Sequence, residues 1–491
     1  MMNKFYSLLT LFCLAANISI AQNLTALVVD KQSGNPIPYA AIKIDDFKGV
    51  VTNDEGLFTV KIDDIKYIEV SCLGYKELEV TIEDIRANNY KIELQAAVNQ
   101  LNEVILSNKL PSVDSIIVRV RKNFYNNHNL DLTALDVFSR QTNYFDFEDF
   151  EFDIKKASTL PKKELTVLKQ NADSLNIAVM NSESKNFEDF SGKLYILEKD
   201  STKLVVDKLT NLVDRKNDYS VEIIQDKAQI IFLKALDTTT TYKVRTGIFR
   251  IEDSLDIEMN DLKEEYSDTT NNSALKAQLA YNLLDVRYLE NHILDDILNT
   301  KYYNFTMRDI VYTDGDMAYI LDFTPAKGKS KFAGTLIVMA NSYAIKRIDY
   351  AFAPGKRGTK VNLKLIAGIK YVEESEYGTI HFSRDVNHMY KPFYIQKGSV
   401  NYVYVNRPFT FVENSKEKNK FGFNLSIEGR VVQKSELLFT GQSSITPEEF
   451  ATITEAKKVN IITLEKYTPS IWEDRQILEP VEEMKSFTVK K

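Results

Sequence analysis

The sequence is poor in the residues that most often carry covalent or metal chemistry. Its 491 residues include only 2 cysteines, 4 histidines and 1 tryptophan. Cys13 lies in a predicted export signal, so the exported chain would keep Cys72 alone and could form no internal disulfide. Cys72 follows Ile68 and Val70 in an apolar alternation, which predicts a buried, inert thiol. Core burial must therefore stabilise the fold.

The histidines show no metal-binding pattern. A zinc carboxypeptidase needs a glutamate three residues after a histidine, and none of the four histidines has one. The phosphate-binding loop, the G-x-S-x-G elbow and the H-E-x-x-H motif are absent as well. The sequence therefore predicts no catalytic, metal-binding or cofactor-binding residue, and no enzyme. The histidines are His128, His292, His381 and His388.

Long apolar runs are also scarce. The most apolar run, Leu8 to Ala16, follows Lys4 and precedes the small residue Ala21, which is typical of a secretory signal over residues 1–21. It is too short to span a membrane, and no later run is long enough. The net charge is -7, with both signs interspersed, so no nucleic-acid partner is expected. We expect an exported protein in the periplasm.

Residues 22–106 alternate between apolar and polar positions with a period of two. Leu27 and Val29 begin this pattern, and Ala40, Ile42 and Ile44 continue it. Turn residues separate short strands and no helix is expected between them. The pattern predicts an antiparallel β-sandwich.

Motifs within this segment resemble the carboxypeptidase-regulatory-like domain, which has a transthyretin-like fold. The glycine usual in the first strand is replaced here by Ala26. The resemblance implies a non-catalytic module of a Gram-negative cell envelope protein. Such a protein would lie in the periplasm, where it could associate with the outer membrane. The motifs are Pro36-x-Pro38-Tyr39-Ala40, Thr52-x-Asp54-x-Gly56-x-Phe58, Ser71-x-x-Gly74-Tyr75 and Leu101-x-Glu103-Val104.

A linker helix is predicted within residues 107–135. Its apolar residues recur at spacings of three and four, with Pro111 near the start and Asn126 near the end. The helix either packs on a neighbouring domain or binds a partner. The apolar positions are Val113, Ile116, Ile117, Val120 and Phe124.

Residues 136–470 are predicted to form a β-rich domain with helical insertions, followed by an extended tail, 471–491. Phenylalanines alternate with carboxylates from Phe145 to Phe152, which favours a strand with one apolar face; a calcium loop would need a different residue order. Residues 161–187 are expected to be a mobile insertion, Leu204 to Val213 a short helix and 276–299 a longer one. A capping box at Thr446 and Glu449 predicts a helix that ends near Lys458.

Residues 302–406 predict a β-meander that forms a large curved antiparallel sheet, resembling a half-barrel in outline. The runs Tyr319 to Pro325 and Phe332 to Tyr350 resemble the periplasmic lipoprotein-carrier and sorting-factor superfamily. That resemblance implies an open half-barrel with a helical lid over an apolar cavity, and the helix at 276–299 would suit the lid.

These features favour a non-enzymatic periplasmic or outer-membrane-associated binding protein. Its ligand would be apolar and lipid-like, held on the sheet by Tyr319, Leu321, Leu336 and Val338. The alternative is a structural or assembly factor that docks an outer-membrane protein complex through the N-terminal sandwich. Peripheral membrane contact through basic turns stays open, whereas charges on both strand faces disfavour a membrane barrel. No oligomeric state is indicated.

Overall fold

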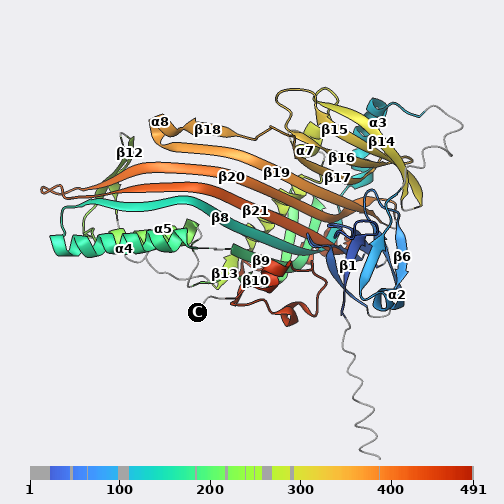
Figure 1. The fold of residues 1–491 in the computed structure, drawn as a ribbon, viewed down its shortest axis with the longest axis horizontal. Coiled ribbons are helices and arrows are strands. Elements are labelled where there is room, and N and C mark those ends of the chain that lie inside the picture. The colour runs from blue at the N-terminus through green and yellow to red at the C-terminus, as the bar shows by residue number, and fades with distance from the viewer. Residues whose placement is uncertain are drawn as a thin grey trace, which may run out of the picture. The chain divides into compact units, whose positions relative to one another are not determined.

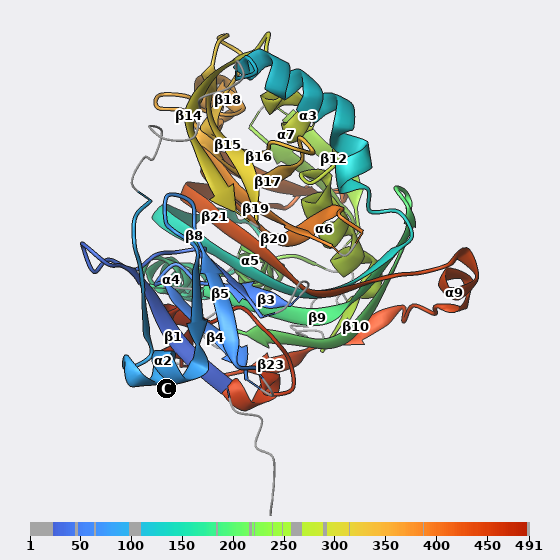
Figure 2. The same ribbon diagram turned by 90° about the vertical axis from the view of Figure 1, so that its right-hand side faces the viewer.

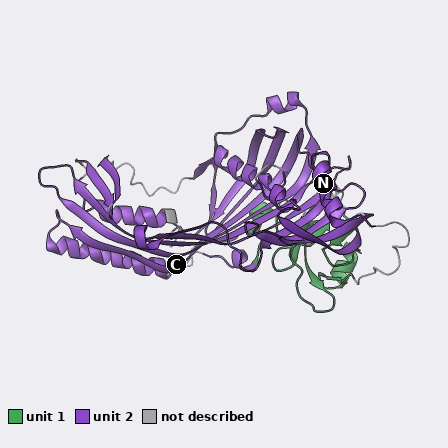
Figure 3. Ribbon diagram, turned by 90° about the horizontal axis from the view of Figure 1, so that it is seen from above, with its two compact units in different colours: residues 1–98, 468–481 green, residues 99–467, 482–491 purple. Residues whose placement is uncertain are grey.

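The protein is described by a computed structural model and divides into two compact units, drawn in different colours in Figure 3. The first unit comprises 1–98 and 468–481, and the second 99–467 and 482–491. The expected export signal and the motif Leu101-x-Glu103-Val104 lie outside the described residues. The structure describes residues 23–44, 48–62, 65–97, 110–182, 185–215, 219, 221–237, 239–247, 249–256, 268–287, 292–313, 315–385 and 387–488.

The first unit contains a three-stranded sheet of order β4-β1-β7 and a four-stranded sheet of order β3-β2-β5-β6. Alternate residues of the strands are buried, and Val28, Ile42, Phe58 and Ile68 have no exposed surface. The predicted β-sandwich is confirmed. The strands are β1 (Asn23–Asp30), β2 (Ala41–Lys43), β3 (Gly49–Val51), β4 (Leu57–Lys61), β5 (Tyr67–Ser71), β6 (Leu78–Thr81) and β7 (Lys91–Leu94).

Three details of this unit differ from the sequence expectation. A helix, α2 (Ile82–Ala87), interrupts the strands because the Thr81 hydroxyl accepts a hydrogen bond from the Asp84 backbone N–H at 3.1 Å. Strand β7 follows this helix and pairs with β1 in parallel rather than antiparallel. The third detail is Cys72, which is partly exposed rather than buried.

Residues 468–481 complete the first unit. The Asn53 side-chain amide donates to the backbone carbonyl of Pro480 at 3.2 Å, and the Thr59 hydroxyl donates to a Glu479 carboxylate oxygen at 2.5 Å. The Gln476 amide donates to the Thr59 carbonyl at 2.7 Å, and Trp472 is 3% exposed. This part of the predicted tail is therefore integrated into the fold. The short helix η2 (Pro469–Trp472) lies within this segment. The next helix, α10 (Glu482–Lys485), belongs to the second unit.

The second unit is built on an open sheet that has 14 strands among the described residues, so the fold is mainly β as predicted (Figure 1). Its main path runs β14-β15-β16-β17-β19-β20-β21-β8-β9-β10-β23 and is antiparallel except for the pair β10 and β23. The strands are β8 (Thr133–Ala157), β9 (Lys185–Glu198), β10 (Ser201–Leu212), β11 (Tyr242–Thr246), β12 (Phe249–Leu255), β14 (Tyr303–Thr313), β15 (Asp316–Pro325), β16 (Phe332–Met339), β17 (Ile345–Phe352), β18 (Lys360–Leu363), β19 (Ile369–Arg384), β20 (Tyr390–Glu413), β21 (Lys420–Ser444) and β23 (Ile462–Leu464). A separate pair joins β13 (Thr269–Asn271) to β22 (Lys458–Asn460).

One face of this sheet carries the helices, and we call it the helix face. At one end, α3 (Val113–His128), α6 (Asn272–Leu284) and α7 (Ile293–Ile297) cover it (Figure 2). His128 fixes α3: its Nε2 accepts from the Ile345 backbone N–H at 3.1 Å, and its Nδ1 lies 3.1 Å from the Tyr390 carbonyl. The carbonyl can only accept, so Nδ1 carries the proton.

At the other end of the long strands, α4 (Lys162–Met180) and α5 (Val221–Leu233) pack on a second apolar core. Phe152, Phe411 and Phe423 from three strands belong to this core, together with Leu168 and Leu175 of α4. Figure 1 shows α4 and α5 alongside the strands at this end. The helix face therefore has helices packed on an apolar core at each of its ends, and a middle part between these two cores.

Several sequence predictions for this unit were wrong. Residues 161–187 are mostly the ordered helix α4, since Leu168, Ala172, Leu175 and Val179 recur at spacings of three and four. Leu204 to Val213 is mostly strand β10, because pairing with β9 outweighs its helical spacing. The region 276–299 forms two short helices. The capping box at Thr446 is confirmed, but α9 (Pro447–Thr452) ends earlier than predicted.

No described helix has the length and apolar character required to cross a membrane.

Candidate functional site: a polar cavity beside helix α6

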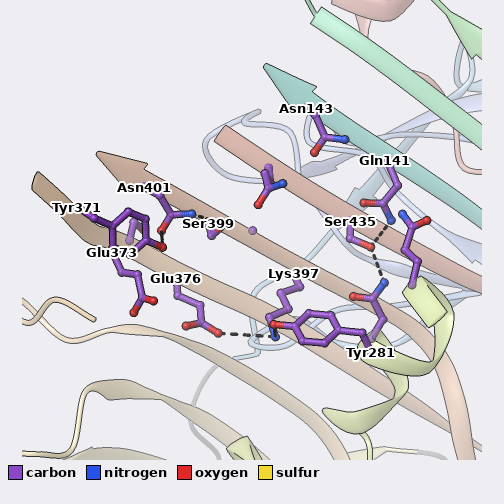
Figure 4. A pocket seen from close by; sticks show the side chains of 15 residues that line it. Gln141, Asn143, Tyr281, Tyr371, Glu373, Glu376, Lys397, Ser399, Asn401 and Ser435 are labelled. Atoms are coloured by element: carbon purple, nitrogen blue, oxygen red, sulfur yellow. Dashed lines mark hydrogen bonds and ion pairs between the residues drawn. The ribbon is translucent and has the colours of Figure 1, made fainter. Parts of the chain in front are cut away.

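A cavity of about 420 Å³ opens between α6 and the middle of the helix face (Figure 4). Its walls come from β8, β19, β20 and β21 on one side and from α6 on the other. Amides, hydroxyls and carboxylates dominate the lining, with two tyrosine rings. The residues are Gln141, Asn143, Gln278, Tyr281, Asn282, Tyr371, Glu373, Ser375, Glu376, Lys397, Gly398, Ser399, Asn401, Gln433 and Ser435.

Strand register places these side chains in rows. Residues directly opposite on paired strands share a face, and every second residue along a strand returns to it. One row contains Lys397, Ser435 and Gln141 on β20, β21 and β8. The next row contains Glu376, Ser399, Gln433 and Asn143. Polar side chains therefore form a continuous patch across four neighbouring strands.

Helix α6 is held over this patch by its own apolar stripe. Leu275, Leu279 and Leu283 are each at most 3% exposed and recur every four residues, so one side of the helix is fixed in the core. At the start of the helix, the Asn272 amide donates to the Leu204 carbonyl at 2.9 Å. Gln278, Tyr281 and Asn282 are consequently turned towards the cavity, as Figure 4 shows for Tyr281.

The Ser435 hydroxyl joins the helix to the sheet. It accepts one hydrogen bond from the Gln141 amide at 2.5 Å and another from the Asn282 amide at 2.8 Å. Both donors are side-chain amides that are largely buried. Three elements, β8, β21 and α6, therefore meet at one serine, which fixes the floor of the cavity.

Lys397 is the only cation in the lining, and carboxylates neutralise it. Its Nζ lies 3.0 Å from a carboxylate oxygen of Asp285 and 3.8 Å from one of Glu376. It also lies 4.6 Å from the centre of the Tyr281 ring, which is cation–π distance. Burial lowers the pKa of Lys397, but the attraction of Asp285 outweighs it, so the pKa is raised and the lysine stays charged.

Burial raises the pKa of both carboxyl groups beside Lys397. For Asp285, burial outweighs the opposing attraction of Lys397. For Glu376, burial is again the largest cause, and Asp285 adds like-charge repulsion. With Glu373 nearby, the charges around the cavity sum to an excess of negative charge at neutral pH. This potential disfavours anionic ligands.

Position 378, beside this cluster, is a glycine and so has no side chain. Gly378 on β19 lies directly opposite Lys397, and a Cβ built on it would lie 2.4 Å from the Tyr350 hydroxyl oxygen. Tyr350 occupies that space, and the Asp285 carboxylate lies close enough to influence its hydroxyl. Burial, followed by the negative charges of Asp285 and Glu376, raises the pKa of Tyr350 well above its ordinary value, so the hydroxyl stays protonated.

Some amides in the lining have no partner within the described part of the chain. Asn143, Gln278 and Gln433 make no side-chain hydrogen bond to other described residues, and Asn143 and Gln433 are exposed. A side-chain amide offers donors and acceptors at the same time. The cavity can therefore hydrogen-bond a ligand whose groups also donate and accept. No group of three metal-binding side chains occurs among the described residues.

The residues predicted to hold an apolar ligand lie elsewhere on the helix face. Tyr319 pairs with Val338 and Leu321 with Leu336, so the structure brings all four together. Tyr319 is 4% exposed and the other three have no exposed surface. None of them lines the cavity. A role in ligand binding stays a prediction for these residues, and it would require the covering helices to move.

The cavity residues were not recognised in the sequence. The available signal was a polar residue at every second position, as in Lys397-x-Ser399-x-Asn401, Gln433-x-Ser435 and Gln141-x-Asn143. Such alternation also describes the solvated face of any strand, so by itself it predicts no site. The contribution of α6 follows only from the three-dimensional fold.

Comparison with known protein families matches one segment near the start of the chain. Residues 27–106 match the CarboxypepD_reg-like domain, in agreement with the motifs in the sequence. None of the curated proteins compared matches the chain.

Solved structures match the rest at low similarity. A LolA superfamily protein from Nitrosomonas europaea is 8% identical with a TM-score of 0.20; the match covers 70% of this chain and 99% of that one. A domain described as an outer membrane lipoprotein-sorting protein from Vibrio parahaemolyticus is 7% identical with a TM-score of 0.21, covering 68% and 95%. The architecture of the second unit is defined by the strand pairing of this chain.

Proposed function

We propose that the protein is a binding protein of the cell envelope that holds a neutral, hydroxyl-rich ligand of the saccharide class in the cavity beside α6. The observation that carries this proposal is a set of three amides without a hydrogen-bond partner among the described residues, Asn143, Gln278 and Gln433, which line the same cavity as the exposed ring of Tyr281. Sugar hydroxyls donate and accept as amides do, and an exposed aromatic ring offers a surface for the apolar face of a sugar.

The charges around the cavity support a neutral ligand. Lys397 is already paired with Asp285 and Glu376, so it is not available to an incoming phosphate or carboxylate. The lining contains neither histidine nor cysteine. These side chains support binding and orientation more than bond cleavage, and the proposal therefore concerns binding. The predicted export signal and the match to the CarboxypepD_reg-like domain support the envelope location that we propose.

A direct binding experiment tests this function. Purified protein lacking residues 1–21 would be titrated calorimetrically with neutral trisaccharides (maltotriose, cellotriose, mannotriose and chitotriose) and with a sialylated trisaccharide. We expect heat from at least one neutral sugar and none from the anionic one, because of the negative potential around the cavity. Binding of the anionic sugar alone, or of no sugar by the wild type, contradicts the proposal.

A lipid-like ligand is the second candidate. The observation that favours it is the continuous apolar surface of Tyr319, Leu321, Leu336 and Val338 beneath the helices. An acyl chain could reach that surface only if α3, α6 or α7 moved away from the sheet. Native mass spectrometry and organic extraction of the purified protein distinguish the candidates, since co-purifying lipid would favour this one and its absence the saccharide.

The assembly-factor alternative has an observation of its own. Side chains fill the space between the sheet and α3 and α7, as a docking platform without a lipid cavity would require. Affinity purification of full-length protein and of a variant lacking residues 22–106 would compare their envelope partners. Partners lost with the first unit would support docking through it; unchanged partners would count against it.

A further inference from the structure

Two hairpins at the far end of the long strands expose large apolar side chains. The first is β18 and β19 with the helical turn α8 (Lys364–Ala367) between them, and the second is β11 and β12. Leu365 is fully exposed and Ile366 is 76% exposed. Ile251 on β12 is 55% exposed and Phe249 is 45% exposed. We call these residues, with Val361, Leu363 and Ile369, the apolar tip.

Arg407 holds the two hairpins beside each other. Its Nη1 donates to the Ala367 carbonyl at the end of α8. Its Nε and Nη2 donate to the Thr246 hydroxyl and carbonyl on β11, both at 2.8 Å. The guanidinium carbon also lies 5.2 Å from the Phe249 ring centre. Because Arg407 itself is only 8% exposed, it fixes the hairpins from beneath. Figure 1 shows α8, β18 and β12 at this same end of the sheet.

The conformation of the α8 turn is also fixed. Gly368 ends the turn with a φ of +62°, a value that favours glycine. A Cβ at this position would lie 2.0 Å from the Asn406 carbonyl oxygen, so a larger residue would not fit. The exposure of Leu365 and Ile366 is thus a consequence of a built turn, held by Gly368 and Arg407.

Basic residues surround the apolar tip. The segment 356–371 contains 5 basic residues and no acidic residue, whereas the whole chain has a net charge of -7. Lys360, Lys364 and Lys370 flank the exposed aliphatic side chains in the hairpin. On the second hairpin, the Asp253 carboxylate is paired with Arg250 at 3.1 Å. The first hairpin therefore combines exposed aliphatic side chains with a cluster of positive charge at its tip, while the nearest carboxylates of the hairpin, Glu373 and Glu374, follow on β19.

We propose that the apolar tip inserts into the headgroup region of an anionic phospholipid membrane, so that the protein binds peripherally at this end. Aliphatic side chains enter the interface, and the long lysine side chains reach the lipid phosphates. A protein partner fits less well, because protein interfaces are depleted in lysine and are commonly anchored by tryptophan, tyrosine and arginine. This binding is independent of the cavity beside α6.

Vesicle flotation tests the proposal. The protein lacking residues 1–21 would be mixed with vesicles of phosphatidylcholine, or of equal parts phosphatidylcholine and phosphatidylglycerol. We expect it to float with the anionic vesicles and much less with the neutral ones, and high salt should weaken the binding. Failure to float with anionic vesicles would overturn the proposal and leave a protein partner for the tip.

Variants separate the two contributions. Leu365→Ser with Ile366→Ser removes the inserted groups and is expected to abolish flotation. Each of Lys360→Gln, Lys364→Gln and Lys370→Gln should weaken partitioning about fivefold. Ile177→Ser is the matched control, since Ile177 is 63% exposed on α4 and is not one of the residues of the apolar tip. Equal loss in the control, or unchanged flotation of the Leu365 and Ile366 variant, contradicts the proposal. Circular dichroism checks that each variant is folded.

A fluorescence experiment reports insertion directly. The chain has 1 tryptophan, and Trp472 is 3% exposed and serves as a constant background. A Leu365→Trp variant should shift its emission to shorter wavelength when anionic vesicles are added, whereas an Ile177→Trp variant should not. Emission from Leu365→Trp that does not change in the presence of bound vesicles would show that the tip stays in water.

Discussion

Arg140 and Asp189 face each other on the paired strands β8 and β9 and are joined by two parallel hydrogen bonds. The Arg140 Nε donates to one carboxylate oxygen at 2.9 Å, and Nη2 donates to the other at 2.7 Å. Both side chains are almost completely buried, with side-chain exposures of 6% and 0%. Burial acts to lower the pKa of Arg140, but Asp189 overcomes it and the pKa is raised. The pair is therefore ionised in the interior of the protein.

Removing one member of this pair is expected to destabilise the protein strongly. Asp189→Asn leaves the Arg140 charge buried without its counter-ion, which should lower the free energy of unfolding by about 3 kcal/mol or more. Urea unfolding followed by circular dichroism measures the change. The double variant Arg140→Met with Asp189→Leu should regain much of the loss. As a control, Asp253→Asn breaks the exposed pair with Arg250 and should change stability little.

His128 predicts how stability depends on pH. Burial lowers the pKa of His128 to about 3, from about 6.5 in the unfolded chain. Between these values the unfolded chain binds a proton and the folded protein does not, so stability is complete above about pH 6.5 and falls as the pH drops towards 3. The expected slope is on the order of 1 kcal/mol per pH unit.

His128→Gln keeps one donor and one acceptor for Tyr390 and Ile345 but cannot be protonated in this range. The difference in urea midpoint between pH 7 and pH 5 should therefore be smaller in the variant than in the wild type. His381 is also buried, with a lowered pKa, and would retain part of the pH dependence. An identical pH dependence in variant and wild type would show that His128 does not contribute.

Gly378 should be sensitive to a single added methyl group. In Gly378→Ala the new Cβ would meet the Tyr350 hydroxyl, and the buried Tyr350 ring would have to shift. We expect a loss of about 1–3 kcal/mol in the free energy of unfolding, as for overpacked interiors. Gly328→Ala is the matched control, because nothing lies within 4 Å of a Cβ at that position. Similar losses in the two variants would mean that the contact with Tyr350 is not responsible.

Tyr281 tests the cavity itself. Under the proposed function, Tyr281→Ala removes the exposed ring and should weaken binding of a neutral saccharide roughly three- to tenfold. Titration calorimetry gives the dissociation constants. Tyr312 is 66% exposed on β14 and does not line the cavity, so Tyr312→Ala is the control and should bind as the wild type does. A saccharide bound equally well by the Tyr281 variant would place its site elsewhere.

The sequence predicted the elements whose periodicity matches their final environment. The β-meander and helix α3 are such cases, because alternate or helically spaced residues become buried in each. The prediction for strand β10 was wrong because its periodicity does not match its final environment. Its apolar spacing also fits a helix, and only pairing with β9 and β23 decides in favour of a strand. Helix α4 was predicted to be a mobile insertion because its polar residues outnumber the four buried residues of its narrow apolar stripe.

The cavity beside α6 could not be predicted because its residues are far apart in the chain. Gln141, Asn282 and Ser435 meet only after β8 has paired with β21, a contact between residues almost 300 positions apart. The predicted apolar residues, by contrast, were found by local alternation. Alternation identifies which residues share a face, but it does not distinguish a face covered by helices from one open to a ligand.

The position of residues 468–481 in the first unit has a consequence for the order in which the protein folds. Asn53 and Thr59 find hydrogen-bond partners at Pro480 and Glu479, which are synthesised after residues 99–467 of the second unit. Translation and export both proceed along the chain from its beginning. The N-terminal module must therefore wait, with these polar groups hydrated, until more than 370 further residues have emerged. The hydrogen bonds of Asn53 and Thr59 with Pro480 and Glu479 therefore form late in the maturation of the protein.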